Sequence, residues 1–185
     1  MDRSPLQWAL TPLRKYATFS GRASRAEFWW FMLLLIVVYL GGSFLLGGIL
    51  GVAGASSSSG DPSVGLAALA GGSGLVLILF WLAVIIPTIA VQVRRLHDTG
   101  RSGWWIGVYY IGYALLVFMM FGSLLAALGG GGDPAAGGLG LSFLLLMGWG
   151  IFGIVLLVFF ILPGTSGANQ YGPDPYGSDY GEVFR

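Results

Sequence analysis

The chain has 185 residues, of which 56% are hydrophobic and only 9% are charged, and its formal net charge is +1. A soluble domain carries about 25% charged residues, so this composition excludes an ordinary soluble enzyme and a nucleic-acid binder with a broad basic face. The sequence has no Cys and a single His, which excludes disulfides, iron–sulfur clusters, thiolate zinc sites and multi-histidine metal sites. We therefore expect no metal, no cofactor and no nucleic-acid partner.

The N-terminal 23 residues predict an interfacial segment that precedes the membrane. Leu6, Leu10 and Leu13 fall on one helical stripe, as in a helix that lies in the headgroup layer. Thr11 followed by Pro12 is typical of an N-cap and a first helical position, so we expect a helix to begin there. Residues 1–23 form the first of three expected regions. A transmembrane domain at 24–162 and a Gly/Pro-rich tail at 163–185 are the other two.

Long apolar runs predict four membrane-spanning helices, at about 28–50, 74–96, 104–128 and 141–162. Each run is long enough to cross about 30 Å of hydrocarbon at 1.5 Å per residue. Backbone groups in lipid must be paired within their own segment, so these runs are expected to be helices. The predicted fold class is all-α: an integral membrane four-helix bundle made of two transmembrane hairpins.

The start of the first span carries a capping-box pattern, Ser24-Arg25-Ala26-Glu27. In such a box the Ser side chain accepts from the Glu amide, and the Glu carboxylate reaches back to the Ser amide. The alternative is that Glu27 acts as an acid or a cation ligand. The pattern favours the cap, because every position matches.

The segments 54–74 and 129–140 are rich in Gly, Ala and Ser, which predicts flexible linkers between the spans. A competing interpretation of the first span is a signal peptide that is cleaved after Ala53-Gly54-Ala55. The 27 residues before the span and its length both exceed what a signal peptide shows, so we retain it as a membrane helix.

The distribution of basic residues predicts the orientation. Eight of the nine lie before the first span and around the join between the second and third spans, and Arg185 lies in the tail, whereas 51–73 and 129–140 contain none. The positive-inside rule then places both termini and the 97–103 turn in the cytoplasm.

The join between the second and third spans is the most polar stretch of the chain. Gly100 suits the left-handed position that ends a helix, and Ser102 is placed to cap the next helix. The Arg residues here have two interpretations: a positive-inside anchor, or a site that binds phosphate through bidentate guanidinium groups. Arg outnumbers Lys eight to one in the chain, and topology alone needs only positive charge.

Three further features bear on function. His97 beside Asp98 suggests a catalytic pair, but helical neighbours point about 100° apart, so a structural hydrogen bond for His97 is favoured. Pro87 should kink the second span and leave the Ala83 carbonyl without its helical donor. Two small-residue series predict helix-packing faces and a possible homo-oligomer: Ser43, Gly47, Gly51 and Ala55, and the pair Gly103 and Gly107.

Three blocks of sequence resemble the domain-of-unknown-function 805 family of small bacterial inner-membrane proteins. They are FSGRASRAEFWWF at 19–31, RRLHDTGRSGWW at 94–105 and GANQYGPDP at 167–175, with Pro87 between the first two. The resemblance covers about residues 12–176 and implies a multi-pass protein of the bacterial inner membrane. It implies no established activity.

All three blocks fall on the side predicted to be cytoplasmic, so we expect the tail to fold back and form one composite site. The preferred function is a non-enzymatic membrane protein that binds anionic phospholipid headgroups or a protein partner at this face. A small-solute channel or transporter is the alternative, and an interfacial lipid-modifying enzyme that uses His97 and Asp98 is the third. The candidate site residues are Arg22, Arg25, Glu27, Arg94, Arg95, His97, Asp98, Arg101, Asn169 and Asp174.

Overall fold

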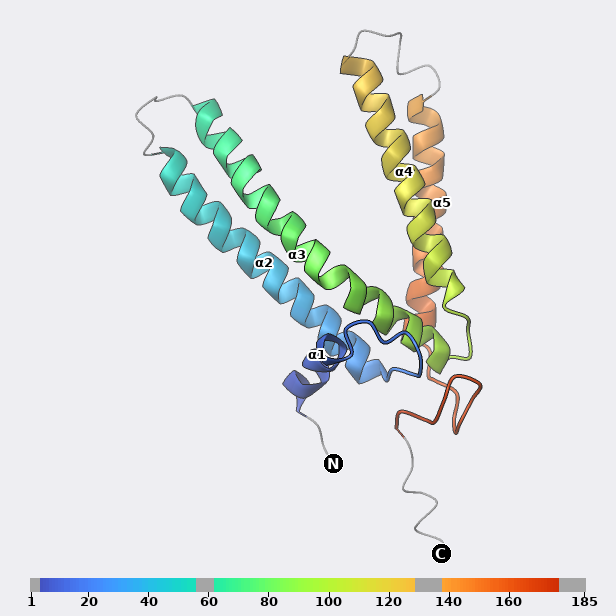
Figure 1. Ribbon diagram of the computed structural model, residues 1–185. Coiled ribbons are helices and arrows are strands. Elements are labelled where there is room, and N and C mark those ends of the chain that lie inside the picture. Colours follow the sequence, from blue (N-terminus) through green and yellow to red (C-terminus); the bar gives the residue numbers. More distant parts are fainter. Residues whose placement is uncertain (1–3, 56–61, 129–137, 177–185) are drawn as a thin grey trace, which may run out of the picture. The chain divides into compact units, whose positions relative to one another are not determined.

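The computed structural model describes residues 4–55, 62–128 and 138–176. Its helices, in chain order, are α1 (Pro5–Arg14), α2 (Arg25–Ala55), α3 (Pro62–Asp98), α4 (Trp104–Leu128) and α5 (Gly138–Ile161) (Figure 1). Four stretches of α2 to α5 are long and apolar enough to cross a membrane: Arg25–Ile49, Gly74–Asp98, Trp104–Ser123 and Phe143–Ile161. The all-α class and the four predicted spans are therefore confirmed.

The chain divides into two compact units. The first comprises residues 1–19 and 26–91, and the second comprises residues 20–25 and 92–185. In the first unit α2 and α3 form a helical hairpin (Figure 1), in which the rings of Tyr39 and Trp81 lie 6.3 Å apart. In the second unit α4 and α5 form the other hairpin, along which aromatic side chains of both helices stack.

The predicted start of the N-terminal helix is wrong. The helix α1 begins at Pro5, and Ser4 and Gln7 form a complete capping box before it. Thr11 lies inside the helix, where its hydroxyl donates to the Gln7 carbonyl at 2.7 Å. The sequence Ser4-Pro5-Leu6-Gln7 is itself a capping-box signal with Pro at the first helical position, and its Ser4 lies seven residues upstream of Thr11.

The predicted linkers are too long. The helix α3 begins at Pro62 and α5 begins at Gly138, so 62–74 and 138–140 are helical. As a sequence pattern, Asp followed by Pro at 61–62 is typical of a helix start, and Ala and Leu in 65–70 are good helix formers. Local propensity therefore extends the second spanning helix beyond the length that hydrocarbon requires. The remaining linker residues, 56–61 and 129–137, lie outside the described part.

Pro87 lies inside α3, as predicted, and the Ala83 carbonyl receives another donor. Tyr16 lies just after α1, and its hydroxyl donates to the Ala83 carbonyl at 2.6 Å. Both residues belong to the first unit. The segment after α1 is thereby joined to the middle of α3. The Thr88 hydroxyl in turn donates to the Val84 carbonyl at 2.6 Å.

Candidate functional site

Nine of the ten candidate residues belong to the second unit, and Glu27 belongs to the first. The nine come from three segments: residues 20–25 before α2, residues 92–101 at the end of α3, and residues 162–176 after α5. The local turns are those that the sequence predicts. Gly100 adopts φ +73°, and the Ser102 hydroxyl accepts from the Trp104 amide at 3.3 Å.

Asp98 is the centre of the site. Its side chain is fully buried, and one carboxylate oxygen accepts from Arg22 Nε at 2.9 Å. The other carboxylate oxygen accepts from Arg95 Nη1. Asp98 therefore stands between two guanidinium groups that are themselves buried, Arg22 and Arg95. A buried carboxylate is stable only with such partners, because its desolvation is otherwise uncompensated.

The remaining donors of these two arginines bind backbone carbonyls. Arg95 donates to the carbonyls of Phe160, at 3.1 Å, and Leu162, which belong to the end of α5. The last carbonyls of a helix have no intrahelical donor, so Arg95 caps α5 from α3. Arg22 donates to the carbonyls of Thr165 and Gly167, which lie beyond that end, both at 2.5 Å.

The tail folds back onto α3, as predicted, but its contacts are mainly with the backbone. Asn169 Nδ2 donates to the His97 carbonyl at 2.9 Å, and the Thr165 amide donates to the Asp98 carbonyl at 2.9 Å. A Cβ at Gly164 would lie 2.6 Å from Asp98 Cγ, so only glycine permits this approach. The tail is therefore packed closely against the buried carboxylate.

Asp174 shapes the tail and does not bind an arginine. Its carboxylate accepts from the amides of Gly167 and Tyr176, at 3.1 and 2.9 Å. The Tyr176 hydroxyl in turn accepts from the Arg25 amide at 2.9 Å, so the tail also holds the segment before α2. Asn169 and Asp174 were expected to meet the guanidinium groups, and the structure places them on amides and carbonyls.

His97 and Asp98 do not form a pair. His97 Nδ1 lies 3.1 Å from the Gly21 carbonyl oxygen, and its ring stacks on Tyr171 with 3.9 Å between centroids. Both oxygens of Asp98 are bound to arginines. The structural hydrogen bond predicted for His97 is confirmed, and the structure does not form the His97–Asp98 pair that the enzyme hypothesis requires. No group of three His, Cys, Asp or Glu residues within the described part is placed to hold a metal ion.

The arginines fall into two classes. Arg22, Arg94 and Arg95 are buried, with at most 7% of their surface exposed. Arg25 is exposed, and its side chain forms no hydrogen bond or ion pair within the described residues. Arg101 is half-buried: its guanidinium lies 4.0 Å from the Phe159 ring centroid and makes one hydrogen bond, to the Thr99 carbonyl at 3.3 Å. The composite site is thus a closed buried cluster with accessible cations beside it.

Sequence reasoning missed the residues that close the cluster. Thr165, Tyr171 and Tyr176 supply a carbonyl, a stacking ring and a hydroxyl. Tyr171 lies within the GANQYGPDP block, close to the candidate Asn169 in the sequence. That position was the signal that could have identified Tyr171 as part of the cluster. Gly103, predicted as a packing residue, packs inside the unit, because a Cβ there would lie 2.7 Å from Val93 Cγ1.

The chain is similar to known bacterial membrane proteins along nearly its whole length. The model of the family described as "Protein of unknown function (DUF805)" matches residues 16–173. The inner membrane protein YhaI of Escherichia coli K12 is 34% identical over 175 residues, which cover 94% of this chain and 100% of that protein. The inner membrane protein YhaH of the same strain is 32% identical over 170 residues, covering 92% of this chain and 97% of that protein.

No solved structure gives a significant match. The family model covers most of the chain, both relatives are inner membrane proteins, and four helices are able to span a membrane. The chain therefore belongs to the DUF805 family of unknown function, as a multi-pass protein of the bacterial inner membrane.

Proposed function

We propose that this protein binds anionic phospholipid headgroups at the cytoplasmic surface of the inner membrane, through the cations that its fold leaves accessible. The observation that carries the proposal is the division of the basic residues. Arg22 and Arg95 are occupied by Asp98 and by backbone carbonyls, and Arg94 is buried, so a ligand meets the exposed basic residues. Of the predicted site residues, this leaves Arg25 and Arg101 as accessible cations, and it adds Arg14 and Lys15.

Four basic side chains of the described part are accessible: Arg14, Lys15, Arg25 and Arg101. Each lies in α1 or its flank, or at the end of a membrane span. Because each span crosses once, the start of α2, the end of α3 and the start of α4 lie at the same membrane surface. A basic residue beside an anionic membrane surface contributes about 1 kcal/mol of binding.

The side chains next to these cations suit the headgroup layer. Trp29 and Trp30 follow Arg25, and Trp104 and Trp105 follow Arg101, all of them exposed. Paired tryptophans at the end of a span are typical of the membrane–water boundary. In α1, Leu6 and Leu13 are exposed while Arg14 ends the helix, a combination typical of a helix that lies on an anionic surface.

The test is native mass spectrometry of the full-length protein in neutral detergent, titrated with phosphatidylglycerol or phosphatidylcholine. We expect the wild type to prefer the anionic lipid. The variant Arg14→Gln/Lys15→Gln/Arg25→Gln/Arg101→Gln should lose phosphatidylglycerol affinity by about a thousandfold, if each of the four cations contributes about 1 kcal/mol. Raising the salt concentration should weaken the wild-type preference, because exposed charges are screened.

The matched control is Arg14→Lys/Arg25→Lys/Arg101→Lys, which keeps the charge and should keep the preference. A wild type that binds both lipids equally would contradict the proposal. So would a glutamine variant whose preference is unchanged.

A further inference from the structure

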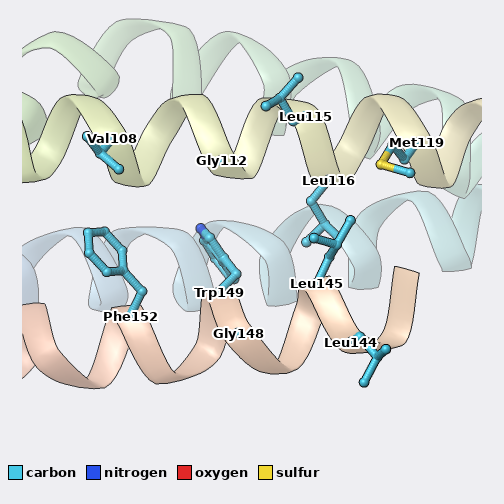
Figure 2. A pocket seen from close by; sticks show the side chains of 10 residues that line it. All are labelled: Val108, Gly112, Leu115, Leu116, Met119, Leu144, Leu145, Gly148, Trp149 and Phe152. Atoms are coloured by element: carbon cyan, nitrogen blue, oxygen red, sulfur yellow. The ribbon is translucent and has the colours of Figure 1, made fainter. Parts of the chain in front are cut away.

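A groove runs between α4 and α5 inside the second unit. It has a volume of about 500 Å³. Its lining residues extend from Val108 to Met119 on α4 and from Leu144 to Phe152 on α5 (Figure 2). Gly112 and Gly148 open its middle, and no lining side chain is charged. In Figure 2 the side chains of Leu116 and Leu145 point toward one another near one end, and Phe152 lies at the other.

The groove lies within the apolar spans of both helices, so its natural surroundings are lipid chains. The spans are Trp104–Ser123 and Phe143–Ile161. The Trp149 indole NH, the polar group of the lining, already donates to the Tyr109 carbonyl at 3.3 Å. The occupant must therefore be apolar along the whole groove.

A line of aromatic rings connects the groove to Arg101. The Arg101 guanidinium lies over Phe159, and the Phe159 ring contacts that of Trp105 at 5.5 Å. The Trp105 ring stacks on Phe152 at 5.8 Å, and Phe152 lines the groove. The cation and the apolar groove are thus two ends of one continuous surface formed by α4 and α5.

The dimensions of this surface match one leaflet of a bilayer. At 1.5 Å per residue, Val108 lies about 6 Å and Met119 about 22 Å along the helix from Trp104. Half of a bilayer measures about 20–22 Å when the headgroup region is included. A phosphate at Arg101 would therefore place an acyl chain beside the groove, ending near the membrane midplane.

We infer that the second unit holds one anionic phospholipid, with its phosphate at Arg101 and one acyl chain in the groove between α4 and α5. The inference rests on the proposed function and gives it a defined site. Arg101 suits the headgroup because most of its guanidinium donors remain available after its one hydrogen bond. The two glycines suit the chain because their missing side chains leave room for it.

Two matched substitutions on α5 test the groove. A Cβ meets nothing within 4 Å at Gly148, which lines the groove, or at Gly150, which does not. We expect Gly148→Leu to lower the affinity for phosphatidylglycerol and for phosphatidylcholine about tenfold, because leucine fills the groove. Gly150→Leu should leave both affinities unchanged. Arg101→Gln should lower only the phosphatidylglycerol affinity, about fivefold, the equivalent of about 1 kcal/mol for one cation.

The measurement is again native mass spectrometry of the full-length protein, with melting temperatures recorded for each variant. Equal effects of Gly148→Leu and Gly150→Leu on lipid affinity would overturn the groove as a lipid site. The proposed function is tested separately, by the preference of the wild type for phosphatidylglycerol over phosphatidylcholine. An unchanged phosphatidylglycerol affinity in Arg101→Gln would overturn the headgroup position. A dimer peak that Gly148→Leu abolishes would assign the groove to a second copy of the chain and overturn the inference.

A second measurement needs no variant. Phosphatidylglycerol with a photoactivatable group midway along one acyl chain should label peptides that contain 108–119 or 144–152 in the wild type. Labelling confined to other peptides would overturn the inference.

Discussion

Two kinds of arginine serve different purposes in this protein. A guanidinium carries five donors in a fixed plane, so a buried one is stable only where several acceptors surround it. Arg95 meets this condition with Asp98 and two carbonyls at the end of α5. Arg25 and Arg101 lack such a shell and are accessible. Internal carbonyl binding therefore accounts for part of the excess of Arg over Lys.

At the residue scale, Asp98→Asn should strongly destabilise the protein. The substitution turns one of the two carboxylate oxygens into an NH₂ donor that faces a guanidinium, and it leaves two buried cations without their counter-charge. Removing one partner of a buried ion pair costs about 3–5 kcal/mol. The free energy of unfolding in detergent, followed by tryptophan fluorescence during denaturant titration, measures this loss.

The matched control is Asp174→Asn, the same chemical change at a half-buried position. Asp174 accepts from two amides and lies in the tail, so its loss should cost about 1 kcal/mol. Equal costs at both positions would show that Asp98 is not the centre of the cluster.

Local signals in the sequence predicted the turns around the buried cluster, and they did not predict the contacts that its side chains make. Gly100, Ser102 and the return of the tail follow from local signals, and the structure has all three. The pairing of Arg22 with Asp98 joins residues far apart in the sequence, and no local pattern encodes such a contact. For the same reason the structural role of Arg22 and Arg95 was not predicted.

At the element scale, the proline in α3 shows how a helix is repaired from outside. Pro87 lacks the amide that would bind the Ala83 carbonyl, and lipid supplies no water to replace it. The Tyr16 hydroxyl makes this bond from the segment after α1. The predicted gap in the helix thus becomes an attachment point for the N-terminal region.

Tyr16→Phe should cost about 1–3 kcal/mol, because it leaves that carbonyl unsatisfied. The cost should fall close to zero in a Pro87→Ala background, where an amide at this position bonds the carbonyl within the helix. A double-mutant cycle on the free energy of unfolding measures the coupling of the two positions.

Tyr39→Phe is the control for this cycle, because the Tyr39 hydroxyl makes no hydrogen bond within the described residues. It should change stability little in either background. A cost of Tyr16→Phe that persists undiminished beside Pro87→Ala would refute the repair.

Some helix boundaries are determined by where the apolar residues end, and others are determined by capping residues. The predicted spans agree with the apolar stretches of α2 to α5 to within a few residues, because burial in lipid requires a fixed length. The start of α1 was mispredicted, since two capping signals lie within one short segment and the upstream one prevails. The extension of α3 to Pro62 was missed because the glycine-rich composition of this segment favoured a linker over the helix-start pattern of Asp followed by Pro.

At the scale of the whole molecule, the positive-inside bias predicts that both termini are cytoplasmic. The chain contains no cysteine, so single-cysteine variants report their own position. A membrane-impermeant maleimide should label Ser166→Cys, in the tail after α5, in inverted vesicles and not in spheroplasts. Ser58→Cys, between α2 and α3, should show the reverse. The opposite labelling of both positions would invert the predicted topology.

The amino-acid sequence was sufficient to predict the all-α membrane class of the protein and its four spans. Composition and hydropathy suffice for these properties, because the bilayer sets the length and the polarity of every crossing segment. The tertiary contacts alone show which polar side chains are buried partners and which are accessible. That distinction depends on the carbonyls at the end of α5, on Gly164 beside Asp98 and on the return of the tail. These contacts join distant parts of the chain, and their energies arise only when the parts have packed.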